Sequence, residues 1–326
     1  MIVLFSFVWT NFLAFAKVYD RTIGVQAAES GSVPREGFLV RLSVIIMRSL
    51  KLLTVFALIW FVSAFDFTEL LKRGPPAPQT NCNSAAFGAA KTHLMKALNL
   101  QGIFDKGSAK TFHSNLITKY SRIQSITDFT NICNAFNVFY GYLGAANIRF
   151  CLGPLGLIKQ GHAPEEAFYY DGILRLNRFQ CGAGYYMAQY RQGDMLKCFV
   201  NTWTNSKKQM LAATANYASN VKDHDNDQIN ACKYAGALQS KYAQIFRIGM
   251  CSRYDPGMAA YFGCEGQSQF IRAQFPHCVY ENRCNYNEIL KGPQYAKLNE
   301  NGEVLIRNSK FVTKGNVTVE EFGEWF

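Results

Sequence analysis

Charged side chains are scarce in this chain of 326 residues. Asp, Glu, Lys and Arg make up 17% of it, whereas hydrophobic residues make up 49% and aromatic residues 14%. A disordered chain has the opposite balance of low hydrophobicity and high charge, so this composition excludes disorder. The length favours one or two domains, and a body of this size buries a core without the help of cross-links.

Motifs of the common enzyme classes are missing. The chain contains no G-x-S-x-G, no G-x-x-x-x-G-K-S/T, no H-E-x-x-H and no G-x-G-x-x-G. The five histidines are scattered, with no two of them four residues apart: His93, His113, His162, His224 and His277. His277 adjoins Cys278, but sequence neighbours on a helix or strand point apart, and Cys278 is expected to be oxidised. The sequence therefore predicts no catalytic residue, no cofactor and no enzyme activity.

The chain also lacks closely spaced cysteine pairs and long basic runs. No Cys-x-x-Cys pair occurs, which disfavours zinc knuckles, thioredoxin-like redox sites and haem attachment. The densest basic spots are the pairs Lys72-Arg73 and Lys207-Lys208. A nucleic-acid or heparin patch needs runs of 5–8 basic residues, so we predict no nucleic-acid partner.

The sharpest candidate for a metal site is the acidic stretch from Asp223 to Asp227, which opens like a calcium-binding EF-hand loop. It lacks the glycine expected at the sixth position, which is Gln228, and the bidentate acid expected at the twelfth, which is Tyr234. We therefore predict no metal site here, and a polar loop in which Asp225 or Asp227 caps the next helix.

The amino-terminal region carries the signature of secretion. From Met47 the chain has two basic residues, Arg48 and Lys51, then the uncharged run Leu52–Phe65, which contains the small residues Ser63 and Ala64. This order is typical of a signal peptide, and the run is shorter than the about 20 residues that a membrane span takes. The predicted parts are a non-native extension (1–46), a signal peptide (47–64), a Pro-rich linker (65–80), a cysteine-rich helical domain (81–290) and a carboxyl-terminal tail (291–326).

A second interpretation of this region keeps a membrane anchor. Cleavage after Ala16 would leave 38–65 in place as an apolar segment, although Arg41, Arg48 and Lys51 interrupt it. A charge at the bilayer centre costs about 2.5–3.5 kcal/mol on insertion scales, which favours the signal peptide. We predict a secreted protein, with a membrane-anchored one as the alternative. In both cases the cysteine region faces the lumen or the extracellular space.

Ten cysteines follow the predicted signal peptide. They are Cys82, Cys133, Cys151, Cys181, Cys198, Cys232, Cys251, Cys264, Cys278 and Cys284. An even number in an oxidising compartment predicts five disulfides, although their pairing is not readable from the sequence. The one N-glycosylation acceptor, Asn316-Val317-Thr318, agrees with a secreted glycoprotein.

The apolar period around the cysteines is helical. One face joins Ile126, Phe129, Cys133, Phe136, Tyr140 and Leu143 at steps of three and four. Another helix opens with Pro164-Glu165-Glu166, which suits a first turn. Further helices are expected near 87–101, 109–123, 178–198, 206–221, 238–249 and 256–274. The prediction is an all-α bundle of about seven or eight helices, cross-linked by disulfides.

The last residues differ from the bundle. Asn301-Gly302 is expected to form a turn, and two short β-prone runs follow it, 303–307 and 310–313. We expect a hairpin or an irregular tail that is loosely packed on the helices.

Two groups of side chains deserve a functional interpretation. Glu165 and Glu166 are consecutive on a helix, so they diverge and serve the helix start rather than a shared substrate. The aromatic clusters Phe168-Tyr169-Tyr170 and Tyr185-Tyr186 are expected to pack in the core or on the surface. The alternative is that they line an apolar pocket between helices.

Four features of the cysteine region carry a family resemblance: Asn81-Cys82, the segment 132–136, the run from Leu143-Gly144 to Cys151, and the pattern Leu174-x-x-Asn-x-Phe-Gln-Cys181-Gly-Ala-Gly184. With these features the region resembles a nematode group of secreted ten-cysteine proteins of unknown function. The resemblance covers about 80–290 and implies a secreted, disulfide-linked, helix-rich chain. It brings no activity, and the tail after Cys284 is longer than the family suggests.

These observations favour a secreted, non-enzymatic binding module for an apolar small molecule or an extracellular protein. A structural component of an extracellular matrix, of the cuticle or eggshell type, is the alternative. A hydrolase with an unrecognised motif is the third hypothesis.

Overall fold

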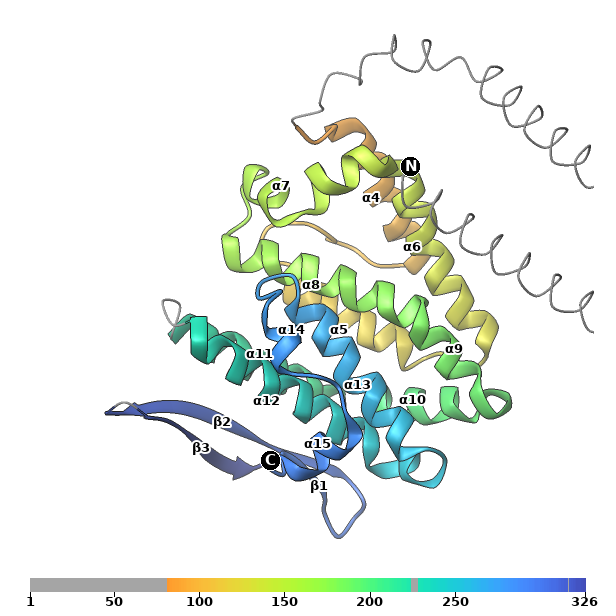
Figure 1. Ribbon diagram of the computed structural model, residues 1–326. Coiled ribbons are helices and arrows are strands. Elements are labelled where there is room, and N and C mark those ends of the chain that lie inside the picture. Colours follow the sequence, from red (N-terminus) through yellow and green to blue (C-terminus); the bar gives the residue numbers. More distant parts are fainter. Residues whose placement is uncertain (1–80, 224–227, 316) are drawn as a thin grey trace, which may run out of the picture. The chain divides into compact units, whose positions relative to one another are not determined.

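A computed structural model of the chain describes residues 81–223, 228–315 and 317–326 (Figure 1). The predicted extension, signal peptide and linker lie outside the described residues. Residues 224–227 of the acidic loop and the glycosylation acceptor Asn316 lie outside them as well.

The described residues confirm the predicted disulfide-linked helical bundle. Eight of their helices have 12 residues or more: α4 (Ser84–Leu98), α5 (Ala109–Tyr120), α6 (Ile126–Asn147), α8 (Pro164–Cys181), α10 (Asp194–Asn205), α11 (Lys207–Asp223), α12 (Gln228–Arg247) and α13 (Pro256–Ile271). The shorter ones are η1 (Ile148–Leu152), α7 (Pro154–Lys159), α9 (Ala183–Gln189), η2 (Tyr190–Gly193), η3 (Gly249–Arg253), α14 (Cys278–Glu281) and α15 (Tyr286–Lys291). None of the described helices combines the length and the apolar character that a membrane span requires.

Local sequence explains where the longest helix begins and which face it buries. The side chain of Ser125 accepts a hydrogen bond from the N–H of Asp128, whose carboxylate accepts one from the N–H of Ser125, which is a capping box. The predicted apolar face of α6 is buried at Phe129, Cys133 and Phe136. The 3.6-residue period thus predicts this helix and its orientation.

The predicted single helix over 178–198 is wrong. Helix α8 ends at Cys181 because the following Gly182 has φ −104° and ψ −106°, which no helix accommodates. A second break separates α9 from α10, where Arg191, Gln192 and Gly193 have φ of 51°, 56° and 91°. A glycine stands at each break, Gly182 and Gly193, and the second break also interrupts the apolar period, so these residues are the signal that the single-helix prediction passed over.

Helices α12 and α13 pack closely beside each other at the centre of the bundle (Figure 1). A Cβ atom added at Gly263 would lie 2.5 Å from the carbonyl oxygen of Tyr242, so glycine is what permits the close approach. Around this contact the rings of Phe199 and Phe262 stack with their centroids 4.0 Å apart, and Trp203 packs against both. Aromatic burial of this kind contributes much of the core's stability.

Five disulfides join elements that are distant in the sequence, as the cysteine count predicts. The pairs are Cys82–Cys151, Cys133–Cys181, Cys198–Cys251, Cys232–Cys278 and Cys264–Cys284. They connect, in that order, the segment before α4 to η1, α6 to α8, α10 to η3, α12 to α14, and α13 to the segment before α15. Because each bond spans two different elements, the framework restrains most of the bundle.

The carboxyl-terminal residues form an antiparallel sheet of β1 (Ala296–Leu298), β2 (Val304–Lys314) and β3 (Val317–Trp325), in the order β1-β2-β3. A β-bulge between Arg307 and Ser309 interrupts the pairing of β2 with β3. The region is β-structured rather than irregular, but both β-prone runs belong to the single strand β2, so they do not form a hairpin with each other.

The expected loose packing of this region is wrong. Ile306 and Phe311 are buried in the main core, and β2 packs on α11. The side-chain amides of Asn216 and Asn220 on α11 donate to the carbonyl oxygen of Ser309 over 3.1 and 3.0 Å. Polar side chains of α11 thus hold the sheet against the helices.

Candidate functional site

The centre of the bundle contains a small cavity of about 20 Å³. Helices α5, α8, α10, α11, α12 and α13 enclose it, and its polar lining comes from His113, Gln180, Tyr242 and Gln267. This volume holds one water molecule, whereas sites for small organic ligands measure about 300–1,000 Å³. Neither aromatic cluster lines this cavity.

Burial and hydrogen bonding determine the state of the polar side chains that line this cavity. Nδ1 of His113 lies 3.0 Å from the hydroxyl of Tyr169, and burial lowers the pKa of His113 to about 4. The carbonyl oxygen of the Gln267 side chain, which is 1% exposed, has no hydrogen-bond partner among the described residues. A buried water suits such a group, and the geometry supports a structural rather than a ligand-binding cavity.

The side chains of Glu165 and Glu166 have different surroundings, as predicted. Only Glu166 makes contacts that stabilise the start of α8. Glu165 is exposed, whereas the carboxylate of Glu166 accepts hydrogen bonds from Nδ1 of His162 over 3.0 Å and from the N–H of Ala109 over 3.3 Å. Burial raises the pKa of Glu166, but these bonds and one from the N–H of Gly107 outweigh it, and the pKa falls below its usual value. The pair fastens the start of α8 to the start of α5.

Sequence analysis missed this His162–Glu166 pair. The signal was available, because the two residues are four apart at the beginning of a predicted helix. Both side chains are largely buried, with 4% and 14% of their surface exposed.

A group of exposed side chains lies where α9 meets η2, and we call Tyr186, Tyr190, Arg191 and Gln192 the Tyr–Arg corner. Tyr186 is 74% exposed and Tyr190 is 44% exposed. The guanidinium of Arg191 lies over the ring of Tyr190, 5.8 Å from its centroid. Arg191 is the one charged residue in the segment 182–193. The sequence drew attention to Tyr185-Tyr186 but not to this grouping.

The backbone of the Tyr–Arg corner is strained. Arg191 and Gln192 both have the left-handed conformation, which costs a non-glycine residue roughly 1–2 kcal/mol. The chain is anchored before the corner by the disulfide from Cys181 to Cys133 and by the hydroxyl of Tyr185, which lies 2.8 Å from the Thr130 hydroxyl.

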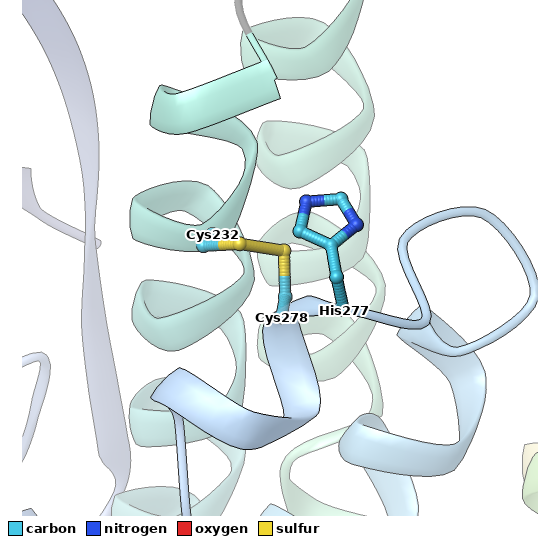
Figure 2. Close-up of side chains that lie close together, drawn as sticks. All are labelled: Cys232, His277 and Cys278. Carbon is cyan, nitrogen blue, oxygen red and sulfur yellow. A yellow bond between two sulfur atoms is a disulfide. The ribbon is translucent and has the colours of Figure 1, made fainter.

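The third candidate is a cluster of potential metal ligands at the Cys232–Cys278 disulfide, to which His277 contributes. Figure 2 shows the imidazole of His277 beside the bond that joins Cys232 of α12 to Cys278 of α14. A ring nitrogen and the two sulfurs lie within 4.8 Å of one another, and no other such group of potential metal ligands occurs in the described part of the chain. Both cysteines are buried and His277 is exposed.

The prediction that His277 and Cys278 point apart is wrong. His277 immediately precedes α14, and consecutive residues on a helix are about 100° apart rather than opposite, so both side chains approach Cys232. Cys278 is oxidised, as expected, so its sulfur is not a nucleophile in this state.

The aromatic clusters are mainly packing residues. Tyr170 is buried against Phe104, with ring centroids 4.9 Å apart, and Tyr169 packs edge-on against Phe270. Tyr185 is half-buried and only Tyr186 projects outward. This matches the expectation of core and surface packing.

Comparison with known proteins identifies no relative. No protein family, no curated protein and no solved structure matches the chain. The resemblance to nematode ten-cysteine proteins therefore stays a prediction.

Proposed function

We propose that the protein is a secreted, non-enzymatic module that binds an extracellular protein through the Tyr–Arg corner. The observation that carries the proposal is the run of left-handed residues 191–193, which presents the exposed Arg191 over the ring of Tyr190 in a segment that follows the disulfide-bonded Cys181. Strained backbone persists where the surrounding structure over-determines it, and such places cluster at functional sites.

The compartment supports this function. Five disulfides indicate an oxidising or extracellular environment. Secretion itself rests on the signal peptide predicted over 47–64.

The geometry favours a protein partner over an apolar small molecule. The central cavity has room for one water. Tyrosine and arginine, in contrast, are the residue types enriched at the energetic centres of protein interfaces. Because a disulfide and the Tyr185–Thr130 contact anchor the chain before the corner, binding orders less backbone there than it would in a free loop.

The charge of the corner indicates the chemistry of the partner. Arg191 is the one charged residue of the segment 182–193, and the nearest acid along the chain, Asp194, pairs with Lys197 over 3.0 Å. Its guanidinium presents several donors, and the two phenols can donate or accept hydrogen bonds. We expect a partner surface with carboxylates that surround an apolar patch.

Site-specific photocrosslinking tests the proposal. A photoreactive benzoylphenylalanine replaces Tyr186 in one variant and Tyr280, which is 81% exposed on α14, in a matched control. Both variants are irradiated in extracellular fluid from the tissue that secretes the protein. We expect one discrete adduct from position 186 and none of that mass from position 280.

Competition makes the result specific. Excess unlabelled protein should abolish the adduct, whereas an excess of the triple variant Tyr186→Ser, Tyr190→Ser, Arg191→Ser should not. Equal labelling from both positions, or equal competition by the triple variant, would contradict the proposal. A compound that adds mass only under native conditions would favour the small-molecule hypothesis instead.

A further inference from the structure

We infer that Cys232, Cys278 and His277 form a zinc-binding site in the reduced form of the protein, before their disulfide closes or after it opens. The inference is independent of the Tyr–Arg corner. Two thiolates and one imidazole are a ligand set that Zn²⁺ accepts in proteins.

The distances suit one ion. The three ligand atoms already lie within 4.8 Å of one another while the sulfurs are bonded. Zinc–sulfur bonds measure about 2.3 Å and zinc–nitrogen bonds about 2.0–2.1 Å, so two ligands of one tetrahedral ion are about 3.5–3.8 Å apart. Once the disulfide opens, the sulfurs separate to this distance and the ring moves inward by about 1 Å, which creates the site.

The local fold keeps the two cysteines adjacent without the disulfide. The side-chain amide of Asn282, directly after α14, donates to the carbonyl oxygen of Cys232 over 2.6 Å. The oxygen of the same amide lies 2.9 Å from where a Cβ atom of Gly236 would be, so the contact depends on a glycine of α12. These contacts hold α14 against α12 through groups other than sulfur.

The open side of the site faces solvent. Cys232 and Cys278 are 3% and 1% exposed, whereas His277 is exposed. Three protein ligands leave the fourth tetrahedral position of Zn²⁺ free, and the histidine side is where water reaches it. The ion would thus enter along the imidazole rather than through the core.

The chemistry of opening is thiol–disulfide exchange. Two thiols of a low-molecular-weight reductant of the glutathione class lose two electrons and become a disulfide, and the Cys232–Cys278 bond takes up the electrons and two protons. Zn²⁺ then displaces the proton of each thiol and binds both sulfurs as thiolates. Zinc bound in this way withholds both sulfurs from oxidation.

Oxidative refolding tests the site in the full mature chain. The protein is reduced completely and refolded in a glutathione redox buffer, with and without one equivalent of Zn²⁺. Without metal we expect five disulfides. With metal we expect a species with four disulfides and one zinc, in which alkylation labels Cys232 and Cys278 alone, and intact mass and peptide mapping identify it.

Two variants separate this site from general effects of zinc on refolding. His277→Ala should weaken zinc binding by more than roughly 100-fold, since even loss of a group that only supports a ligand costs 10–100-fold. With zinc present it should form all five disulfides. His93→Ala, a histidine far from these cysteines in the sequence, should behave like the natural chain.

Three results would overturn the inference. The first is that all five disulfides form with zinc present at the rate seen without it. The second is a zinc-bound species labelled at other cysteines. The third is equal zinc retention by His277→Ala. Cobalt offers a readout that does not depend on refolding yield, because thiolate-to-cobalt absorption should appear in the trapped species and change in His277→Ala.

Discussion

The ammonium group of Lys241 on α12 donates a hydrogen bond over 2.6 Å to the side-chain oxygen of Asn216 on α11, in the layer between the helices and the carboxyl-terminal sheet. The same nitrogen lies 3.4 Å from the hydroxyl of Ser309 on β2 and 5.3 Å from the ring centroid of Tyr295. Lys241 is 2% exposed. A buried cation thus joins α11, α12 and the sheet, and its burial carries a desolvation cost.

We predict that this cost makes the stability of the protein rise with pH. Burial lowers the pKa of Lys241 to about 8, against 10.5 in the unfolded chain. Between these values the unfolded chain holds more protons, so the free energy of unfolding increases as pH rises. From pH 8 to 10 the increase is roughly 2 kcal/mol. Lys241→Met should lack it, and denaturant titrations of both proteins at several pH values give the difference.

The prediction is judged on the difference in the free energy of unfolding between the natural chain and Lys241→Met. Tyrosines also titrate in alkali, and the difference removes their contribution. Burial raises the pKa of Tyr242 and Tyr217 well above its usual value, which lowers the stability of both proteins equally in strong alkali. A constant difference between natural chain and variant from pH 8 to 10 would contradict the prediction.

A second prediction concerns acid. His113 is buried and its folded pKa is about 4, against 6.5 in the unfolded chain. As pH falls below 6.5 the unfolded chain takes up a proton that the folded chain does not, so stability decreases. The loss from pH 7 to 4.5 is roughly 2 kcal/mol.

Replacement of this histidine checks the acid prediction. His113→Phe removes the titrating group and should flatten the pH dependence over this range, although the loss of the contact with Tyr169 lowers stability at all pH values. Replacement of the half-buried His93 by Phe is the control and should leave the slope unchanged. Parallel slopes in natural chain and His113→Phe would show that another group causes the acid sensitivity.

Local patterns in the sequence were enough to predict most of the helices. The apolar steps from Ile126 to Leu143 depend only on the helix period, and Pro164 with two acids depends only on the first turn. The five disulfides follow from the number of cysteines and the compartment. Their pairing does not, because it is set by contacts such as that of α12 with α14, which no local pattern encodes.

The features that sequence reasoning missed come from tertiary contacts. The left-handed conformation of Arg191 and Gln192 is unusual for these residue types, so composition does not indicate it. The docking of the sheet uses Asn216 and Asn220 of α11, whose partner on β2 is about 90 residues away in the sequence. His277 meets Cys232 only because α14 folds back onto α12.

A third prediction concerns the contact of α12 with α13. Gly263→Ala should destabilise the protein by about 3 kcal/mol or more, because the new Cβ atom would lie 2.5 Å from the backbone oxygen of Tyr242 and 2.9 Å from the ring of Phe246. Gly257→Ala, on the same helix, places its Cβ atom 3.5 Å from its nearest neighbour and should change stability by less than about 1 kcal/mol. Thermal unfolding of the two variants compares them directly. Equal effects would mean that α13 shifts without cost.

The last prediction concerns how the sheet is held. The side chain of Gln244 on α12 accepts hydrogen bonds from the N–H groups of Tyr295 and Ala296, over 2.6 and 3.0 Å, and donates to the carbonyl oxygen of Pro293 over 2.8 Å. Gln244→Leu keeps the volume but leaves these buried groups without partners, at a cost of about 1–3 kcal/mol each.

The effect should be confined to the sheet. We expect amide hydrogen exchange in 295–311 to accelerate by roughly two orders of magnitude, since 1.4 kcal/mol is about a factor of ten, while α4 to α8 keep their protection. Gln269→Leu is the control, because its amide bonds only to Glu265 within α13. Unchanged exchange in the sheet would mean that the apolar contacts of Ile306 and Phe311 hold it alone, whereas faster exchange throughout would show that the sheet and the helices unfold together.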